Sequence, residues 1–127
     1  MSHPPIAQQI TFLYTKNLDI STRFYEQQLG LELWLDQETC RIYRVSGDGY
    51  LGLCQGMEGI RTPTGKQTDI IFTLVTPQVD EWYDYLKQQG VEFEQPPSIN
   101  PKYNIYHCFC RDPDGYLIEI QRFLQDV

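Results

Sequence analysis

The chain has 127 residues, of which 41% are hydrophobic and 13% aromatic, which suits one small globular domain and excludes a multidomain enzyme. Ten Lys and Arg residues stand against 17 Asp and Glu residues, so the net charge is −7. An acidic chain without a basic cluster repels phosphates, which argues against nucleic acid and anionic membranes as partners. Neither a membrane-spanning apolar run nor a secretory signal occurs in the sequence, so we expect a cytoplasmic protein.

The first half of the chain predicts a strand over 10–15, followed by a helix. Asn17 can cap this helix, and Gly30 ends it. The expected buried stripe of the helix consists of Leu18, Ser21, Phe24, Tyr25 and Leu29. Short strands are then expected over 31–35, 41–45 and 50–55, with a tight hairpin turn at 47–49 before the last.

The second half repeats this order. A strand is expected over 70–75, Thr76 can cap the next helix, Pro77 suits its first position, and Gly90 closes it. The expected apolar face of this helix consists of Val79, Trp82, Tyr83 and Leu86. Strands are again expected over 91–94, 106–111 and 116–122, with a turn at 112–115.

Two short identities support a duplication. The run Asp-Gly-Tyr-Leu occurs at 48–51 and again at 114–117, and Gln55 and Gln121 follow at the same offset of 66 residues. The segments around Gly30 and Gly90 also resemble each other. The prediction is one α+β domain of two βαβββ modules, about 8–55 and 69–124, with a linker rich in Gly, Thr and Pro over 56–68.

The chain contains Cys40, Cys54, Cys108 and Cys110. An even number permits two disulfides, but a chain without a secretory signal favours buried, reduced thiols. Cys108 and Cys110 are expected on one face of a strand. Their spacing is not that of a zinc site.

The paired modules, with Phe24-Tyr25 before Leu29-Gly30-Leu31 and the late run Asp-Pro-Asp-Gly-Tyr-Leu-Ile-Glu-Ile over 112–120, resemble the vicinal oxygen chelate superfamily. This superfamily includes glyoxalase I, bleomycin-resistance proteins, fosfomycin-resistance thiol transferases and extradiol dioxygenases. The resemblance implies that the two modules form a cupped mixed β-sheet with helices outside, that a ligand binds in the concave interior, and that the protein is a homodimer.

The resemblance also implies four positions for metal ligands, on the first and last strand of each module. Counting along the repeat gives Ile10, Leu53, Ile71 and Glu119, of which only Glu119 offers a donor atom. The leading hypothesis is therefore a protein without a cofactor that binds a small organic ligand. The alternative is a divalent-metal lyase, isomerase or transferase with a degenerate metal site, and a third reading is a scaffold or regulatory domain whose cup is filled by side chains.

Strand alternation suggests which side chains line the cup. With Glu119 facing inward, Leu117 and Gln121 follow, and the repeat adds Leu51, Leu53 and Gln55. Inward positions at Ile10 and Ile71 bring Phe12, Tyr14, Asp69 and Thr73. The predicted ligand-binding residues are Tyr14, Leu53, Gln55, Ile71, Thr73, Tyr103, Phe109 and Gln121. An aromatic group of Trp34, Tyr43, Tyr103 and Tyr106 is expected at the edge of the cup.

His107 and Glu119 are the candidate catalytic residues. A histidine exchanges protons near neutral pH, and Glu119 is expected on the neighbouring strand. The alternatives are a hydrogen-bonded histidine without a chemical role and a carboxylate left over from a lost metal site. Phe109 stands where the resemblance places a catalytic tyrosine in extradiol dioxygenases, which counts against dioxygenase chemistry.

Overall fold

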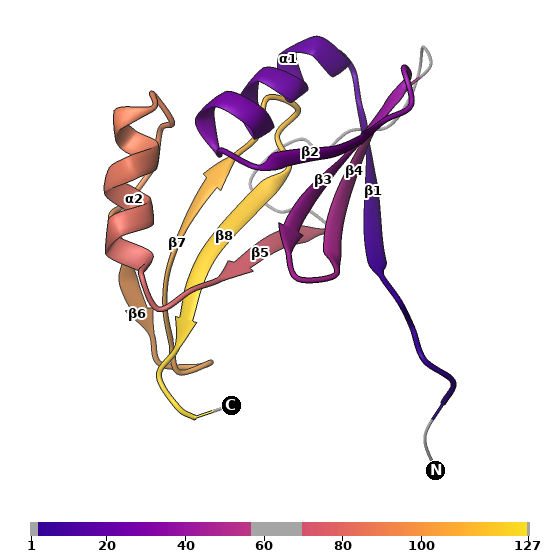
Figure 1. The fold of residues 1–127 in the computed structure, drawn as a ribbon. Helices are drawn as coiled ribbons and strands as arrows, with labels where there is room; N and C mark the ends of the chain where they lie inside the picture. The colour runs from indigo at the N-terminus through magenta and orange to yellow at the C-terminus, as the bar shows by residue number, and fades with distance from the viewer. Residues whose placement is uncertain (1–2, 57–69, 127) are drawn as a thin grey trace. The chain divides into compact units, whose positions relative to one another are not determined.

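A computed structural model of the chain describes residues 3–56 and 70–126. The chain forms two compact units, Met1–Thr62 and Pro63–Val127, each with the predicted βαβββ order (Figure 1). Unit 1 contains β1 (Gln9–Thr15), α1 (Leu18–Arg23), the π-helix η1 (Phe24–Gln28), β2 (Glu32–Asp36), β3 (Cys40–Ser46) and β4 (Gly49–Gln55). Unit 2 contains β5 (Ile71–Val75), α2 (Val79–Gln88), β6 (Ser98–Asn100), β7 (Ile105–Arg111) and β8 (Leu117–Phe123). The α+β class is confirmed.

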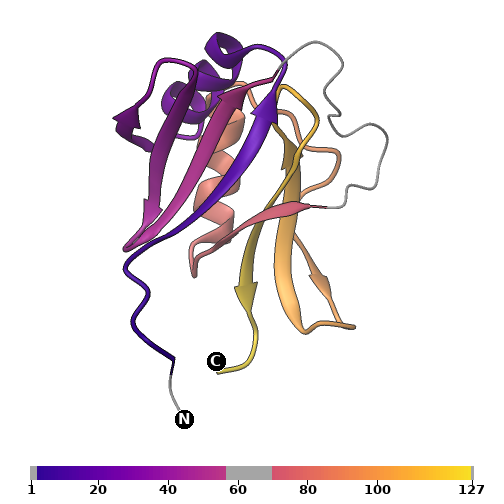
Figure 2. The same cartoon turned by 90° about the vertical axis from the view of Figure 1, so that its right-hand side faces the viewer.

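Each unit has a mixed sheet of four strands, visible in Figure 2. The order is β1-β4-β3-β2 in unit 1 and β5-β8-β7-β6 in unit 2. In both sheets the first and last strands of the unit run parallel, and the other neighbours are antiparallel. The helix connects the first strand of each unit to the second strand, which runs parallel to it at the opposite edge of the sheet, whereas short turns are enough for the antiparallel neighbours.

The first helical segment buries the predicted stripe completely, at Leu18, Ser21, Phe24, Tyr25 and Leu29. The Asn17 side chain caps it by accepting a 3.1 Å hydrogen bond from the backbone N–H of Ile20. After Arg23 the helix widens into a π turn, in which the N–H of Leu29 donates to the carbonyl of Phe24 at 2.8 Å. Gly30 ends the segment with a φ of 83°, a conformation that favours glycine.

Helix α2 begins later than the sequence predicts. Its N-cap is Gln78, and the Thr76 hydroxyl accepts a hydrogen bond from the Gln78 backbone N–H at 3.1 Å instead of capping the helix itself. Val79 and Leu86 are buried, whereas Trp82, expected in the core, is half-buried.

The strand expected over 91–94 does not form. The Val91 side chain is buried, and its backbone N–H donates to the carbonyl of Leu86 at the end of α2. The Phe93 ring packs on Tyr83 of α2 with 4.8 Å between centroids. This segment therefore packs on the helix, and the strand β6 forms beyond Pro96 and Pro97, which cannot donate hydrogen bonds to a sheet.

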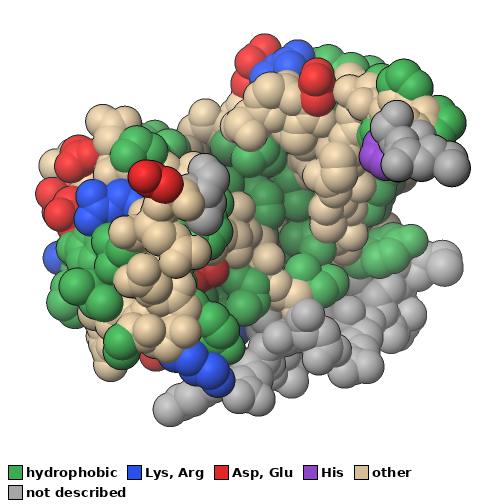
Figure 3. All heavy atoms as spheres, turned by 90° about the horizontal axis from the view of Figure 1, so that it is seen from below, with side chains coloured by type: hydrophobic (Ala, Val, Ile, Leu, Met, Phe, Trp, Pro, Cys, Tyr) green, Lys and Arg blue, Asp and Glu red, His purple; other side chains and the backbone are tan. Residues whose placement is uncertain are grey.

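On the face drawn in Figure 3, hydrophobic side chains form much of the surface, and Lys and Arg occur in small groups near acidic residues rather than as a broad basic patch. No helix in the described parts of the chain is long and apolar enough to cross a membrane.

Candidate functional site

The sheet of unit 2 has two different faces. Ile118 and Ile120 of the central strand β8 are fully buried, and on the same face the Tyr106 hydroxyl donates a hydrogen bond to Asp80 of α2 at 2.5 Å. Helix α2 therefore covers this face (Figure 1). Because side chains alternate along a strand, Glu119 lies on the opposite face.

Three polar side chains meet on that opposite face, and we call Thr73, His107 and Glu119 the polar cluster. Thr73 of β5 lies directly across from Glu119 in the parallel ladder, and its hydroxyl donates to Glu119 Oε1 at 3.1 Å. His107 Nδ1 lies 2.7 Å from Glu119 Oε2. The residue Glu119 is only 8% exposed, and the His107 side chain 12%. Hydrogen bonds thus compensate both carboxylate oxygens for their burial.

Two further residues border the polar cluster. Phe109 lies directly across from Glu119 in the antiparallel ladder, and its ring contacts the His107 ring edge-on, with centroids 4.9 Å apart. Gln121 lies directly across from His107. Its side-chain oxygen Oε1 is buried, and the described residues offer it no hydrogen-bond partner.

The cluster determines which nitrogen of His107 carries the proton. An ionised carboxylate only accepts hydrogen bonds, so His107 Nδ1 must donate to Glu119. In the neutral ring, Nε2 then has a free lone pair, which can accept a hydrogen bond or a proton. The arrangement can therefore recognise a donor or transfer a proton, with Glu119 holding the imidazole in one orientation.

The structure brings together most of the residues predicted for unit 2. Besides the polar cluster, Ile71, Phe109 and Gln121 lie on the same face as Glu119. The pairing of His107 with Glu119 across neighbouring strands is as predicted, while their catalytic role stays a prediction. Asp69 lies outside the described residues.

The aromatic residues do not gather as expected. Tyr103 lies in the turn before β7, is 63% exposed, and has the Lys102 ammonium 5.3 Å from its ring. Tyr106 points to α2, and Tyr43 is fully buried with its hydroxyl bonded to Glu26 of η1 at 3.2 Å. The prediction that Tyr106 and Tyr43 lie at the edge of a ligand site is wrong, because both side chains lie on the helix-covered faces of their sheets.

Unit 1 corrects the predicted orientation of two residues. Gln55 accepts a hydrogen bond from the backbone N–H of Leu18 at 2.8 Å, so its side chain lies at the start of α1. Leu53, only 1% exposed, shares that helix-covered face. Tyr14 lies on the other face of the sheet and is 58% exposed. Leu53 and Gln55 therefore do not face the same way as Tyr14, contrary to the prediction.

Structural counting identifies the unit 1 counterpart of Glu119. Asn17 and Gln78 are the N-caps of corresponding helices, and five residues before them stand Phe12 and Thr73. Thr73 lies across from Glu119, whereas Phe12 lies across from Gly52. The counterpart of Glu119 is therefore Gly52, not Leu53.

Phe12 covers this glycine. A Cβ atom added at Gly52 would overlap the Phe12 ring, so the ring lies directly over the glycine. The Phe12 ring thus occupies the space that a side chain at position 52 would fill.

The metal site implied by the resemblance does not fit these residues. Its four positions are now Ile10, Gly52, Ile71 and Glu119, and only Glu119 has a donor side chain. Both oxygens of that carboxylate are hydrogen-bonded to Thr73 and His107. A divalent ion needs several donors, and among the described residues no group of three His, Cys, Asp or Glu side chains is placed to hold one.

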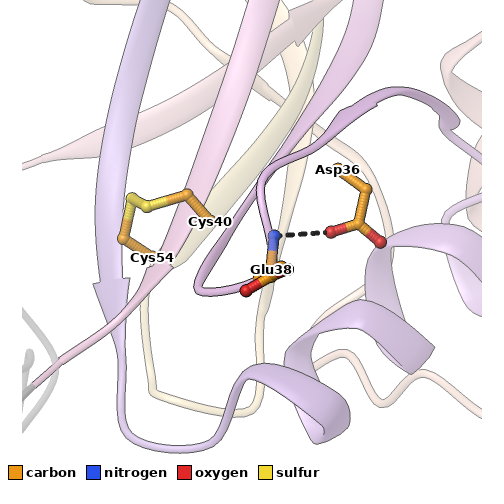
Figure 4. Close-up of a disulfide and its surroundings, with 4 residues drawn as sticks. All are labelled: Asp36, Glu38, Cys40 and Cys54. Atoms are coloured by element: carbon orange, nitrogen blue, oxygen red, sulfur yellow. Dashed lines mark hydrogen bonds between the residues drawn. A yellow bond between two sulfur atoms is a disulfide. The ribbon is translucent and has the colours of Figure 1, made fainter.

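A disulfide between Cys40 and Cys54 joins β3 to β4, which contradicts the expectation of four reduced cysteines (Figure 4). The two residues lie directly opposite each other in the antiparallel ladder. Next to them, the Asp36 side chain accepts a 2.9 Å hydrogen bond from the backbone N–H of Glu38 and shapes the β2–β3 turn. A separation of 14 residues is compatible with two cysteines on neighbouring strands of a hairpin. The sequence would reveal this pair only if the register of the β3–β4 ladder were known.

The other two cysteines agree with the prediction. Cys108 and Cys110 are free and buried on one face of β7. Burial raises the pKa of each thiol to about 12. These side chains therefore pack as small apolar groups rather than acting as nucleophiles.

One family model matches most of the chain. The model of the Glyoxalase/Bleomycin resistance protein/Dioxygenase superfamily matches residues 7–120. The Bacillus subtilis (strain 168) protein YraH, described as uncharacterized, is 28% identical over 113 residues, covering 82% of this chain and 88% of YraH.

Solved structures share the fold. A glyoxalase/bleomycin resistance protein/dioxygenase from Nocardioides matches with a TM-score of 0.75 and 23% identity, covering 100% of this chain and 89% of its own. Lactoylglutathione lyase from Agrobacterium tumefaciens matches with a TM-score of 0.72 and 24% identity, covering 94% of this chain and 96% of its own. TioX from Micromonospora sp. ML1 matches with a TM-score of 0.73 and 20% identity, covering 92% of this chain and 98% of its own.

Proposed function

The chain belongs to the Glyoxalase/Bleomycin resistance protein/Dioxygenase superfamily, and we propose that it binds a small organic ligand, without a metal, at the polar cluster of unit 2. The observation that carries this proposal is the bonding of Glu119. Thr73 and His107 occupy its two carboxylate oxygens, and the other positions of the family's metal site have no donor side chains.

The surroundings of the cluster suit an organic molecule. Ile71 is about half exposed, and Phe109 presents an aromatic ring beside His107. A few fixed polar groups among apolar side chains are typical of small-molecule sites, where the apolar groups contribute affinity and the polar groups determine orientation. We further propose a cytoplasmic homodimer that interacts with neither nucleic acid nor membranes.

Metal analysis tests the first part of the proposal. Protein purified without a metal-binding tag or chelator should hold far less than one equivalent of Ni, Zn, Mn or Fe, also after incubation with each ion. Nearly one equivalent, lost in Glu119→Ala, would instead support the metal-dependent lyase, isomerase or transferase.

A ligand screen by thermal unfolding tests the second part. A ligand at 100 times its Kd stabilises the folded chain by about 2.7 kcal/mol, which corresponds to a rise in Tm of roughly 10 °C. His107→Phe should abolish the shift, whereas His3→Phe, a control in the N-terminal segment, should preserve it. A diverse library without a single hit would favour the scaffold alternative. Light scattering would test the homodimer.

A further inference from the structure

Within the described part of the chain, His107 and Gln121 each leave one hydrogen-bond acceptor unused. The first is Nε2 of the neutral His107 ring, in which Nδ1 carries the proton toward Glu119. The second is Gln121 Oε1, which is buried without a partner among the described residues. A buried acceptor without a donor is costly. The Gln121 residue is itself partly exposed, so its amide can turn this oxygen toward a bound group that supplies a donor.

The two residues that carry these acceptors lie next to each other. His107 and Gln121 are directly opposite in the β7–β8 ladder, which places their Cβ atoms about 5 Å apart on the same face. Phe109 flanks them, with its ring 4.9 Å from that of His107. An acceptor pair beside an aromatic ring matches a flat group with two N–H donors.

Charge points in the same direction. Glu119 is the acidic residue behind the His107 ring, and the chain carries a net charge of −7. A bound cation gains from this field, whereas a carboxylate ligand would meet two acceptors and a nearby negative charge.

We propose that the site selects planar cationic donors of the amidine or amino-heterocycle class, with one N–H on His107 Nε2 and another on Gln121 Oε1. This inference rests on the proposed function and adds the ligand's chemical class. Glu119 acts here as a positioning residue, since it holds the tautomer of His107 that accepts.

Three probes with one ring and different polar groups test the proposal: benzamidine, benzamide and benzoate, with binding followed by NMR titration of the whole chain. We expect benzamidine to bind at least about tenfold more tightly than benzoate, with benzamide between them. The largest shifts should occur at β7 and β8.

Gln121→Leu removes the second acceptor and should weaken benzamidine binding about tenfold. Gln88→Leu makes the same change on the exposed part of α2 and should leave binding unchanged. Equal affinity in Gln121→Leu and the parent, tighter binding of benzoate, or no binding of any probe would overturn the inference. If the three probes fail but the diverse library gives hits, the proposed function is still supported. If neither the probes nor the library give a ligand, the proposed function is refuted together with this inference.

Discussion

Glu119 should determine the tautomer of His107, and this can be measured directly. The His107 side chain is 12% exposed, and its Nδ1 lies 2.7 Å from the carboxylate. A hydrogen bond to a charged group contributes about 1.5–3 kcal/mol. At about 1.4 kcal/mol per tenfold change, the neutral ring should favour the Nδ1–H form by roughly ten- to a hundredfold.

The substitution Glu119→Gln removes the charge and keeps the shape of the side chain. A neutral hydrogen bond contributes about 0.5–1.5 kcal/mol, so the preference for Nδ1–H should fall to roughly two- to tenfold. Long-range ¹⁵N–¹H correlation spectra of the His107 ring distinguish the two tautomers, recorded at a pH at which the ring is neutral.

Thr73→Val is the matched control, since it removes the hydrogen bond to the other carboxylate oxygen and leaves the one to His107. It should keep the Nδ1–H form dominant. A parent protein with mainly Nε2–H, or an unchanged ratio in Glu119→Gln, would refute the orienting role of the carboxylate. The acceptor assigned to Nε2 would then be lost too.

Three further predictions concern unit 1. The Cys40–Cys54 disulfide closes a loop of 14 residues, so its reduction should lower the unfolding free energy by about 3 kcal/mol in denaturant titrations; four free thiols in unreduced, denatured protein would contradict the bond. Burial raises the pKa of Tyr43 from 10.0 to about 12, which favours its neutral form in the folded chain. The contribution of the neutral phenol to the free energy of unfolding is therefore complete below pH 10 and is lost as the pH rises through 12. Tyr43→Phe should show a smaller loss of stability over that range, and an unchanged pH profile would contradict this. Gln55→Ala removes a cap of α1 and should cost about 1–2 kcal/mol in urea unfolding, whereas Gln27→Ala, an exposed position, should cost little; equal losses would argue against capping.

Local signals explain what the sequence could predict. The helical stripe from Leu18 to Leu29 is buried as expected, because its spacing, the cap at Asn17 and the ending at Gly30 are all encoded within one segment. The face of β8 was likewise predictable, since alternation from a single residue, Glu119, assigns every other position on the strand.

The face of β4 was not predictable from the repeated run Asp-Gly-Tyr-Leu. Both units have a five-residue connection before their last strand pairs fully, over 45–49 and 112–116. In the connection over 45–49, Asp-Gly stands at the fourth and fifth places. In the connection over 112–116, it stands at the third and fourth places. In unit 2 the Asp112 side chain accepts hydrogen bonds from the backbone N–H groups of Asp114 and Tyr116, and this shapes the connection differently. A shift of one residue reverses every side chain, so identity in sequence misplaced Leu53.

The disulfide depends on the same kind of detail. A two-residue turn at Gly47 and Asp48 pairs Ser46 with Gly49, and this register extended along the hairpin would place Cys40 opposite Gln55. A bulge between Arg44 and Ser46 moves the ladder by one residue and brings Cys40 opposite Cys54. Neither the bulge nor its position follows from residue types, because it is set by how the whole strand packs. The bond therefore became visible only with the register, although both cysteines are plain in the sequence.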